Sequence, residues 1–149
     1  KKGRIVYGGG GITPDIFVED KTTFTKDSGK LLRSSKRFLF KYANDIKHNY
    51  QHLQSFKAFK TFINKKEIDS KHFFKWIDHL INNDDEYSFE YNQDSLLVNW
   101  DFISNRIKSE IASNIWGKDY LYVMRLDSDP QFQSAIDNFI NAQKLLIDE

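Results

Sequence analysis

The chain has 149 residues, 40% of them hydrophobic and 15% aromatic, and this composition excludes global disorder because it suffices for a hydrophobic core. It contains no cysteine, which excludes disulfides and thiolate metal sites, and no apolar run approaches the roughly 18 residues of a membrane-spanning helix. The net charge of +1 conceals an asymmetry: residues 1–75 carry 17 Lys and Arg against 7 Asp and Glu, and residues 76–149 carry 5 against 14. We expect the two halves to pack together with complementary charge; the alternative is a basic half that faces an acidic partner.

Residues 1–27 form a glycine-rich, β-like region. Four consecutive glycines, Gly8 to Gly11, separate the apolar runs Ile5-Val6-Tyr7 and Ile16-Phe17-Val18. This pattern predicts a short strand, a tight glycine crossing and a second strand, because backbone can approach other backbone closely at glycine. No signal peptide or native start is recognisable at Lys1, so we expect the chain to be a piece of a longer protein.

The glycine run does not predict a nucleotide site. A phosphate cradle needs a helix N-terminus directly after the glycines. Here Pro14 favours extended geometry at Thr13, and no Gly-Lys-Ser or Gly-Lys-Thr follows.

Residues 28–149 change to a period of about 3.6 and predict a mainly α-helical bundle of about five to six helices. The first helix is expected from Gly29 to Leu53, and a short helix around residues 56–63 follows. A third helix is expected to be capped by Asp69 or Ser70 and to end near residues 82–85. The stretch from Tyr87 to Tyr91 alternates and predicts a short strand or an extended linker.

The longest helix is expected over residues 94–116, closed by Gly117 in a left-handed conformation. A short helical turn around residues 120–124 follows. Asp129 and Pro130 predict the start of the final helix, since aspartate caps and proline suits the first helical position.

The apolar stripes of these helices predict the core. The expected buried residues are Leu32, Leu39, Tyr42, Ala43, Ile46, Tyr50, Phe56, Phe59, Phe62, Ile63, Phe73, Trp76, Ile77, Leu80, Ile81, Leu96, Trp100, Ile103, Ile107, Ile111, Ile115, Phe132, Ile136, Phe139, Ile140 and Leu146.

No catalytic, cofactor-binding or metal site is predicted from the residues. His48 and His52 share a helix face but lack a third ligand, and His72 and His79 lie two turns apart. No serine lies in a Gly-x-Ser-x-Gly or Ser-x-x-Lys motif. The adjacent pairs Ser70-Lys71 and Lys108-Ser109 do not make a dyad, and residues 84–86 predict a solvated acidic loop.

A basic stripe accompanies the first predicted helix, with aromatic residues interleaved. It comprises Lys30, Arg33, Lys36, Arg37 and Lys41, and the aromatics are Phe38, Phe40 and Tyr42. Nucleic-acid binding is one interpretation of such a stripe. We favour the other, in which the aromatic side chains belong to the core.

The run Gly3-Arg4-Ile5-Val6-Tyr7-Gly8-Gly9-Gly10-Gly11-Ile12-Thr13-Pro14-Asp15 resembles the end of the protease domain in the carboxyl-terminal processing peptidases, or tail-specific serine proteases. Residues 107–117 and 127–130 are similar to the helical C-terminal extension of the Bacteroidetes-type members.

The resemblance implies a parent serine endopeptidase of the periplasm or cell envelope, with a Ser nucleophile, a Lys general base and a PDZ domain. By the resemblance all of these precede Lys1, so no catalytic residue is carried over onto this chain. Gly8 to Gly11 and Asp15 match the family motif as scaffold.

We therefore expect residues 1–27 to be the C-terminal edge of the protease domain, and residues 28–149 to be an α-helical C-terminal domain with a structural or interaction role. The expected partners are the missing protease and PDZ domains and a second copy of the chain, without cofactor or nucleic acid. Two alternatives remain: a complete hydrolase with an unrecognised site, and a stand-alone helical module whose basic face binds an acidic partner or nucleic acid.

Overall fold

The computed structural model describes residues 14, 16–19 and 22–147, and the side chains only as far as residue 143. In this part of the chain there are nine α-helices and two short 3-10 helices. They are α1 (Lys26–Arg33), α2 (Phe38–Ile46), η1 (Lys47–Tyr50), α3 (Phe56–Lys65), α4 (Ser70–Asn83), η2 (Asp85–Tyr87), α5 (Gln93–Leu97), α6 (Trp100–Trp116), α7 (Lys118–Leu126), α8 (Pro130–Asp137) and α9 (Phe139–Ile147).

The mainly α-helical class is confirmed, whereas the predicted strands are not seen. The run Ile5-Val6-Tyr7 and the four glycines lie outside the described residues, and Ile16, Phe17 and Val18 form no strand. None of the helices in the described ranges has both the length and the apolar character that crossing a membrane requires.

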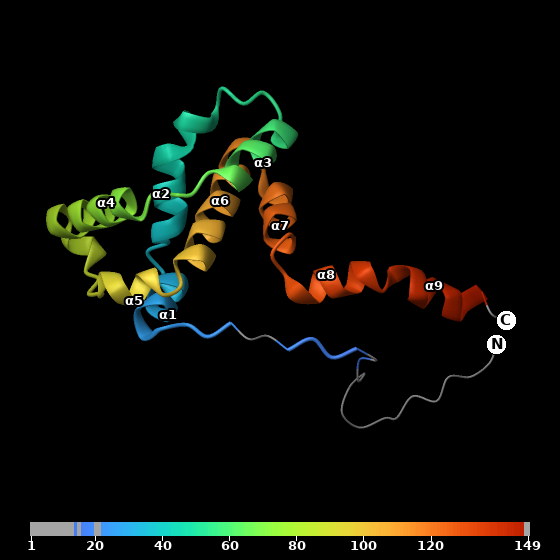
Figure 1. Cartoon of the computed structure of the whole chain (residues 1–149). Helices are drawn as coiled ribbons and strands as arrows, with labels where there is room; N and C mark the ends of the chain where they lie inside the picture. The colour runs from blue at the N-terminus through green and yellow to red at the C-terminus, as the bar shows by residue number, and fades with distance from the viewer. Residues whose placement is uncertain (1–13, 15, 20–21, 148–149) are drawn as a thin grey trace.

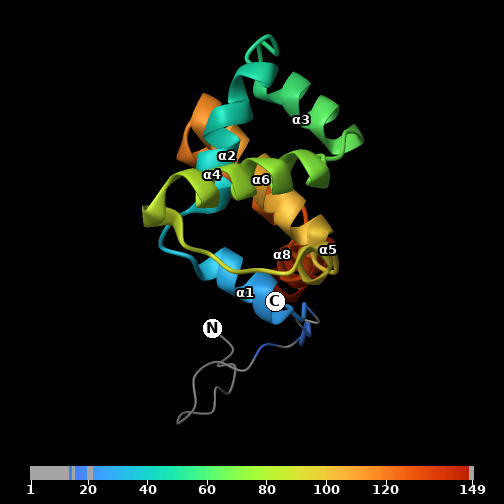
Figure 2. The ribbon, with the colours of Figure 1, turned by 90° about the vertical axis from the view of Figure 1, so that its left-hand side faces the viewer.

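Helix α6 is the centre of the fold. It packs against α2 on one side and α7 on the other, and α3 contacts it as well (Figure 1). Helix α4 packs against α2, and its Phe73 and Phe74 contact Trp100 at the start of α6, while α1 and α5 pair at one end of the body (Figure 2). Helices α8 and α9 extend away from this body as an arm (Figure 1).

The predicted stripe of the longest helix forms the middle of the core. Ile103, Ile107 and Ile111 are completely buried, as is Leu96 on α5. Their spacing of four residues places them on one face of the helix.

An aromatic cluster joins α4 to this core. Phe73 is completely buried and packs edge-on against Tyr42 of α2, with ring centroids 5.0 Å apart. The indole N–H of Trp100 donates to the carbonyl of Ile68 at 3.1 Å, and that of Trp76 donates to the Asp45 carboxylate at 2.7 Å. These bonds satisfy the polar ends of large rings whose bodies are packed.

The prediction of one helix from Gly29 to Leu53 is wrong, because α1, α2 and η1 are separate elements. Residues 34–37 form a turn in which the Ser34 hydroxyl accepts from the Lys36 N–H at 3.3 Å, a local bond that competes with helix. Arg37 adopts a left-handed φ of 54°. The turn also changes the buried face, so Leu31 and Phe38 enter the core while Leu32 and Leu39 are half-buried.

The helix predicted over residues 94–116 is likewise two helices, α5 and α6. They are separated at Val98 and Asn99, and the Asn99 side chain explains the interruption. Its oxygen accepts from the Thr25 N–H at 3.0 Å, and its amide donates to the Thr23 carbonyl at 2.9 Å. Asn99 therefore ties the segment before α1 to the beginning of α6.

The stretch from Tyr87 to Tyr91 is the extended linker of the two alternatives. Tyr87 is the last residue of η2, and residues 88–91 form no strand. The alternating aromatic rings still face the core: Phe89 packs on Phe38 at 5.0 Å, and Tyr91 stacks on Phe74 at 6.1 Å.

The helices predicted around residues 56–63 and from residue 70 to residues 82–85 are confirmed as α3 and α4. The turn predicted around residues 120–124 is the longer helix α7. Asp69 caps α4 as predicted, accepting from the Lys71 N–H at 2.9 Å. Gly117, between α6 and α7, has a positive φ of 105°, but its ψ of 169° is extended rather than left-handed helical.

The final helix begins at the predicted residue, but its apolar side chains are exposed rather than buried as predicted. Asp129 caps α8 by accepting from the N–H groups of Gln131 and Phe132, but the helix is divided from α9 at Asn138. The residues predicted to be buried are exposed: 37% for Phe132, 55% for Ile136, 66% for Phe139 and 67% for Ile140. The side chain of Leu146 lies outside the described residues. An apolar stripe needs a partner surface to be buried, and α8 and α9 extend beyond the one that α6 and α7 offer.

Alkaline pH should destabilise the fold through two tyrosines. Burial raises the pKa of Tyr42 and Tyr91, and the bond that Tyr91 donates to the Asp78 carboxylate at 2.6 Å raises the pKa of Tyr91 further. Above pH 10 the folded chain thus retains protons that the unfolded chain releases, so stability is complete below about pH 10 and falls above it. Urea unfolding between pH 8 and 11 should show this decline, and the double variant Tyr42→Phe, Tyr91→Phe should flatten it. An equal slope in that variant would contradict the assignment.

Candidate functional site

The four histidines serve structural or surface roles. His48, His52 and His79 are exposed on separate helices or turns, and His72 Nδ1 shares a hydrogen bond with the Tyr42 hydroxyl at 2.7 Å. Nowhere in the described ranges do three or more His, Asp or Glu side chains gather as metal ligands would.

Neither Ser-Lys pair shows a serine-to-lysine hydrogen bond among the described residues, although Ser109 lines the second of the hollows described below. Ser109 is buried and donates to the Asn105 carbonyl of its own helix at 2.7 Å. Lys108 is also buried, which lowers the pKa of its ammonium, and Ser104 lies one turn before it on α6. Neither Ser104 nor Lys108 lines either of the two hollows described below.

The acidic loop predicted at residues 84–86 has local structural roles. The Asp84 carboxylate accepts from the Glu86 N–H at 3.0 Å and caps η2. Glu86 pairs with Lys36 at 3.4 Å, and Lys60 pairs with Asp127 at 2.7 Å. These two ion pairs join the basic half of the sequence to the acidic half.

The turn between α1 and α2 divides the predicted basic stripe. Lys30 pairs with Asp27 at 3.7 Å, and Lys41 lies over the Tyr87 ring at 5.0 Å. The interleaved Phe38 and Tyr42 are buried, as favoured. Two members of the stripe instead face a hollow that the sequence did not predict.

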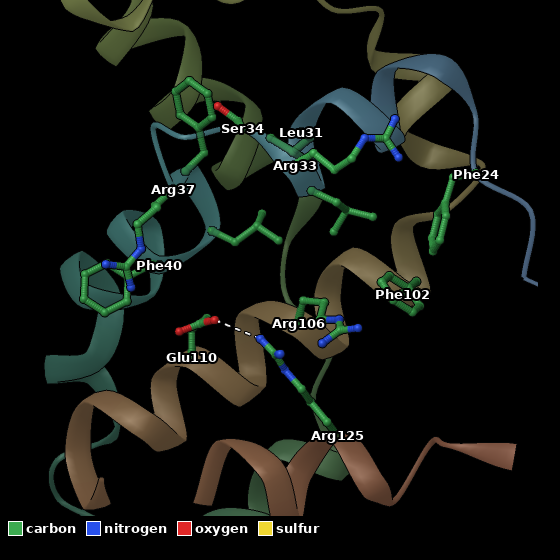
Figure 3. Close-up of a pocket in the computed structure, with 13 residues that line it drawn as sticks. Phe24, Leu31, Arg33, Ser34, Arg37, Phe40, Phe102, Arg106, Glu110 and Arg125 are labelled. Atoms are coloured by element: carbon green, nitrogen blue, oxygen red, sulfur yellow. Dashed lines mark hydrogen bonds and ion pairs between the residues drawn. The ribbon is translucent and has the colours of Figure 1, made fainter. Parts of the chain in front are cut away.

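This hollow, which we call the arginine hollow, has a volume of about 470 Å³ and lies between α1, α2, α6 and α7 (Figure 3). Its polar lining is four arginines, one carboxylate and the Ser34 hydroxyl, and its apolar lining is rings and leucines. The charged residues are Arg33, Arg37, Arg106, Arg125 and Glu110, and Phe102 is one of the rings.

Local sequence and packing place each arginine. Arg33 and Arg37 flank the turn after α1, and Arg37 lies over the Phe40 ring at 4.1 Å. The Arg33 guanidinium lies against the backbone at Gly29, within 2.7 Å of where a Cβ would be, so glycine leaves room for it. Arg106 comes from the middle of α6, and Arg125 comes from the end of α7.

Arg125 and Glu110 form the one ion pair inside the arginine hollow. Nη2 of Arg125 donates to Oε1 of Glu110 at 3.0 Å, and this bond fastens α7 to α6 (Figure 3). The Nε–H of Arg125 is buried without an acceptor in the described part of the chain. Glu110 therefore balances one arginine, and no carboxylate of the described residues pairs with the other three.

The surroundings of Arg106 disfavour its positive charge. It is partly buried over the Phe102 ring, 4.8 Å from the centroid, and makes no ion pair with any described residue. Burial and the nearby Arg125 charge lower the pKa of its guanidinium, and Glu110 opposes this only in part. Arg106 is thus a partly buried cation whose acidic neighbour Glu110 is already paired with Arg125, so the site favours an incoming anion.

A second hollow of about 990 Å³ continues from the first, because Phe24, Phe102, Arg106 and Arg125 line both. The segment before α1 contributes Thr22 and Phe24, and the beginning of α8 contributes residues 128–131. Phe24 packs edge-on against Phe102 at 4.8 Å and stands between the hollows. The two hollows together make a groove with a cationic end and a more apolar end.

Sequence analysis missed this site because its residues come from four distant segments. One signal was present: Arg106 and Arg125 are the only arginines in the strongly acidic half of the chain. Their separation of 19 residues gives no helical spacing, so only the antiparallel packing of α6 and α7 brings them together.

The fold and the groove define a helical domain with an uncompensated cationic hollow. No family model, no curated protein and no solved structure matches this chain.

Proposed function

We propose that this chain is the non-catalytic C-terminal helical region of a carboxyl-terminal processing serine endopeptidase of the periplasm or cell envelope, where it has a structural and interaction role. The uncovered apolar face of α8 and α9 carries this proposal. Phe132, Ile136, Phe139 and Ile140 are spaced as core residues are, yet all four are exposed. Contiguous apolar surface of this kind is typical of a face that another body covers.

The position of the N-terminal segment supports the protease body as the occupant. Thr22 and Phe24 line the same hollow as residues 128–131, so the chain enters the helical body beside the start of α8. In Figure 1 the N-terminal segment and the α8–α9 arm leave the body in the same direction. A protease domain that precedes this segment in the chain would thus join the body on the side where α8 begins.

The gene sequence ahead of Lys1 tests the family assignment directly. We expect it to encode a PDZ domain and a serine and lysine of a protease core. A gene that encodes nothing proteolytic ahead of this segment would overturn the proposal.

Light scattering after size-exclusion chromatography tests the occupant of the arm. With the protease body as occupant, the 149-residue chain should be a monomer with rapid amide exchange in α8 and α9. If the chain is a dimer, Phe139→Glu dissociates it and the matched control Val98→Glu does not, then a second copy of the chain covers the arm instead. Val98 is a suitable control because it is 73% exposed and lies away from the arm.

A hydrolase assay tests the absence of catalysis. Incubated with an unstructured protein substrate, the 149-residue chain should release no peptides. Cleavage that Ser104→Ala abolishes would show a Ser104–Lys108 pair at work, because deprotonation of a buried lysine is the change that activates a neighbouring serine. That outcome would make the chain an enzyme in its own right.

A further inference from the structure

The strongest unexplained feature is the charge of the arginine hollow. Arg33, Arg37 and Arg106 line it without an ion pair in the described residues, the first two at its exposed edge, and Glu110 is already bound to Arg125. Surface arginines are usually solvated, but Arg106 is partly buried against Phe102 and beside a second guanidinium. We propose that the arginine hollow binds an organic monocarboxylate with an apolar body, the carboxylate on Arg106 and the body along the groove past Phe102.

The planar fork of arginine selects the charged group. Guanidinium presents two parallel N–H donors that match the two oxygens of a carboxylate, and such bidentate pairs are among the stronger hydrogen bonds in proteins. Figure 3 shows the Arg125 guanidinium turned toward Glu110 with the Arg106 guanidinium nearby, so a carboxylate on Arg106 would also lie near Arg125. One negative charge would relieve the repulsion between these two groups.

The apolar lining selects the rest of the ligand. Phe24 and Phe102 stand between the two hollows, and the second hollow is lined by more apolar than polar surface. Each of the two hollows, taken by itself, has a volume within the range of small-molecule sites. A bare phosphate has no apolar part to place there, and with its greater charge it loses more hydration on entry. A singly charged acid with a chain or a ring uses both ends of the groove.

Two kinds of acid carry this shared chemistry, and the probes separate them. Octanoate represents a free aliphatic acid, and N-acetylphenylalanine represents an acylated apolar amino acid. Octanol and inorganic phosphate are the controls, because each has only one half of the chemistry.

Isothermal titration calorimetry of the intact 149-residue chain at low salt tests the proposal. At least one of the two acids should bind with a dissociation constant below about 1 mM, and both controls should bind at least tenfold more weakly. Arg106→Met, which keeps an apolar stem and removes the guanidinium, should weaken acid binding at least tenfold. Arg106→Lys should restore part of it, because the charge returns without the fork.

Lys57→Met is the matched control variant, since Lys57 is an exposed cation on α3 outside both hollows. It should bind the acid as the unmodified chain does. Thermal unfolding followed by circular dichroism checks that Arg106→Met is folded, and because Arg106 has no ion pair to lose, its melting temperature should be unchanged or higher. Equal binding of octanol, tighter binding of phosphate, no binding of either acid at 10 mM, or undiminished binding by Arg106→Met would each overturn the proposal. None of these results bears on the gene sequence that tests the protease assignment.

Discussion

Replacing Phe73 with alanine should lower the free energy of unfolding by about 3–5 kcal/mol. Phe73 is completely buried on α4. Its ring packs against Tyr42 of α2, Trp76 of the same helix and Trp100 of α6. Alanine would leave a cavity among rings that cannot collapse into it, since Trp76 and Trp100 are held by hydrogen bonds at their indole N–H groups. Urea unfolding followed by tryptophan fluorescence measures the change.

Phe139→Ala is the matched control for this prediction. The same side-chain atoms are removed, but Phe139 is 66% exposed on α9 and touches little of the body. We expect a change within about 0.5 kcal/mol, as for other exposed positions. Phe73→Leu keeps most of the volume and should lie between the two. A loss at Phe139 as large as that at Phe73 would mean that the arm is packed, and would contradict the exposed face on which the proposed function depends.

The comparison of these two phenylalanines also shows what the sequence could predict. Both lie on apolar stripes of helical spacing, and the sequence predicts burial for both. Periodicity reports which face of a helix is apolar, and this was sufficient for Ile103, Ile107 and Ile111 at the centre of the fold. Periodicity does not report whether a partner surface exists, so it failed for Phe139 and Ile140.

The breaks within predicted helices could not be predicted for a related reason. Ser34 and Asn99 are tolerated within helices, and the local bond that Ser34 accepts from Lys36 is one that a serine can also forgo, so neither residue by itself predicts a helix end. At Asn99 the interruption depends on bonds to Thr23 and Thr25, more than 70 residues earlier in the chain. The arginine hollow has a similar origin, because only the packing of α1, α2, α6 and α7 brings Arg33, Arg37 and Arg106 to the lining of one hollow. Tertiary packing, which single-sequence patterns do not contain, therefore decides both the boundaries and the site.

Replacing Gly117 with alanine should lower the free energy of unfolding by about 1–3 kcal/mol through the backbone alone. With φ at 105° and ψ at 169°, Gly117 lies in a region that is essentially restricted to glycine. An added Cβ would meet no atom within 4 Å, so neither a clash nor a lost contact contributes to the result. This conformation sets the turn from α6 into α7, and that turn brings Arg125 within 3.0 Å of Glu110. Strain at Gly117 should therefore also weaken binding in the arginine hollow.

Gly29→Ala changes the other glycine that the structure describes, and we do not expect it to lower the free energy of unfolding. Gly29 lies inside α1, where alanine is favoured over glycine by about 1 kcal/mol. Its new Cβ would lie 2.7 Å from a terminal nitrogen of Arg33, a flexible group that can move aside. Urea unfolding should thus show Gly29→Ala to be neutral or stabilising while Gly117→Ala is destabilising. Equal effects at the two positions would mean that α7 does not depend on the Gly117 conformation for its direction, and the pairing of Arg125 with Glu110 would then need another cause.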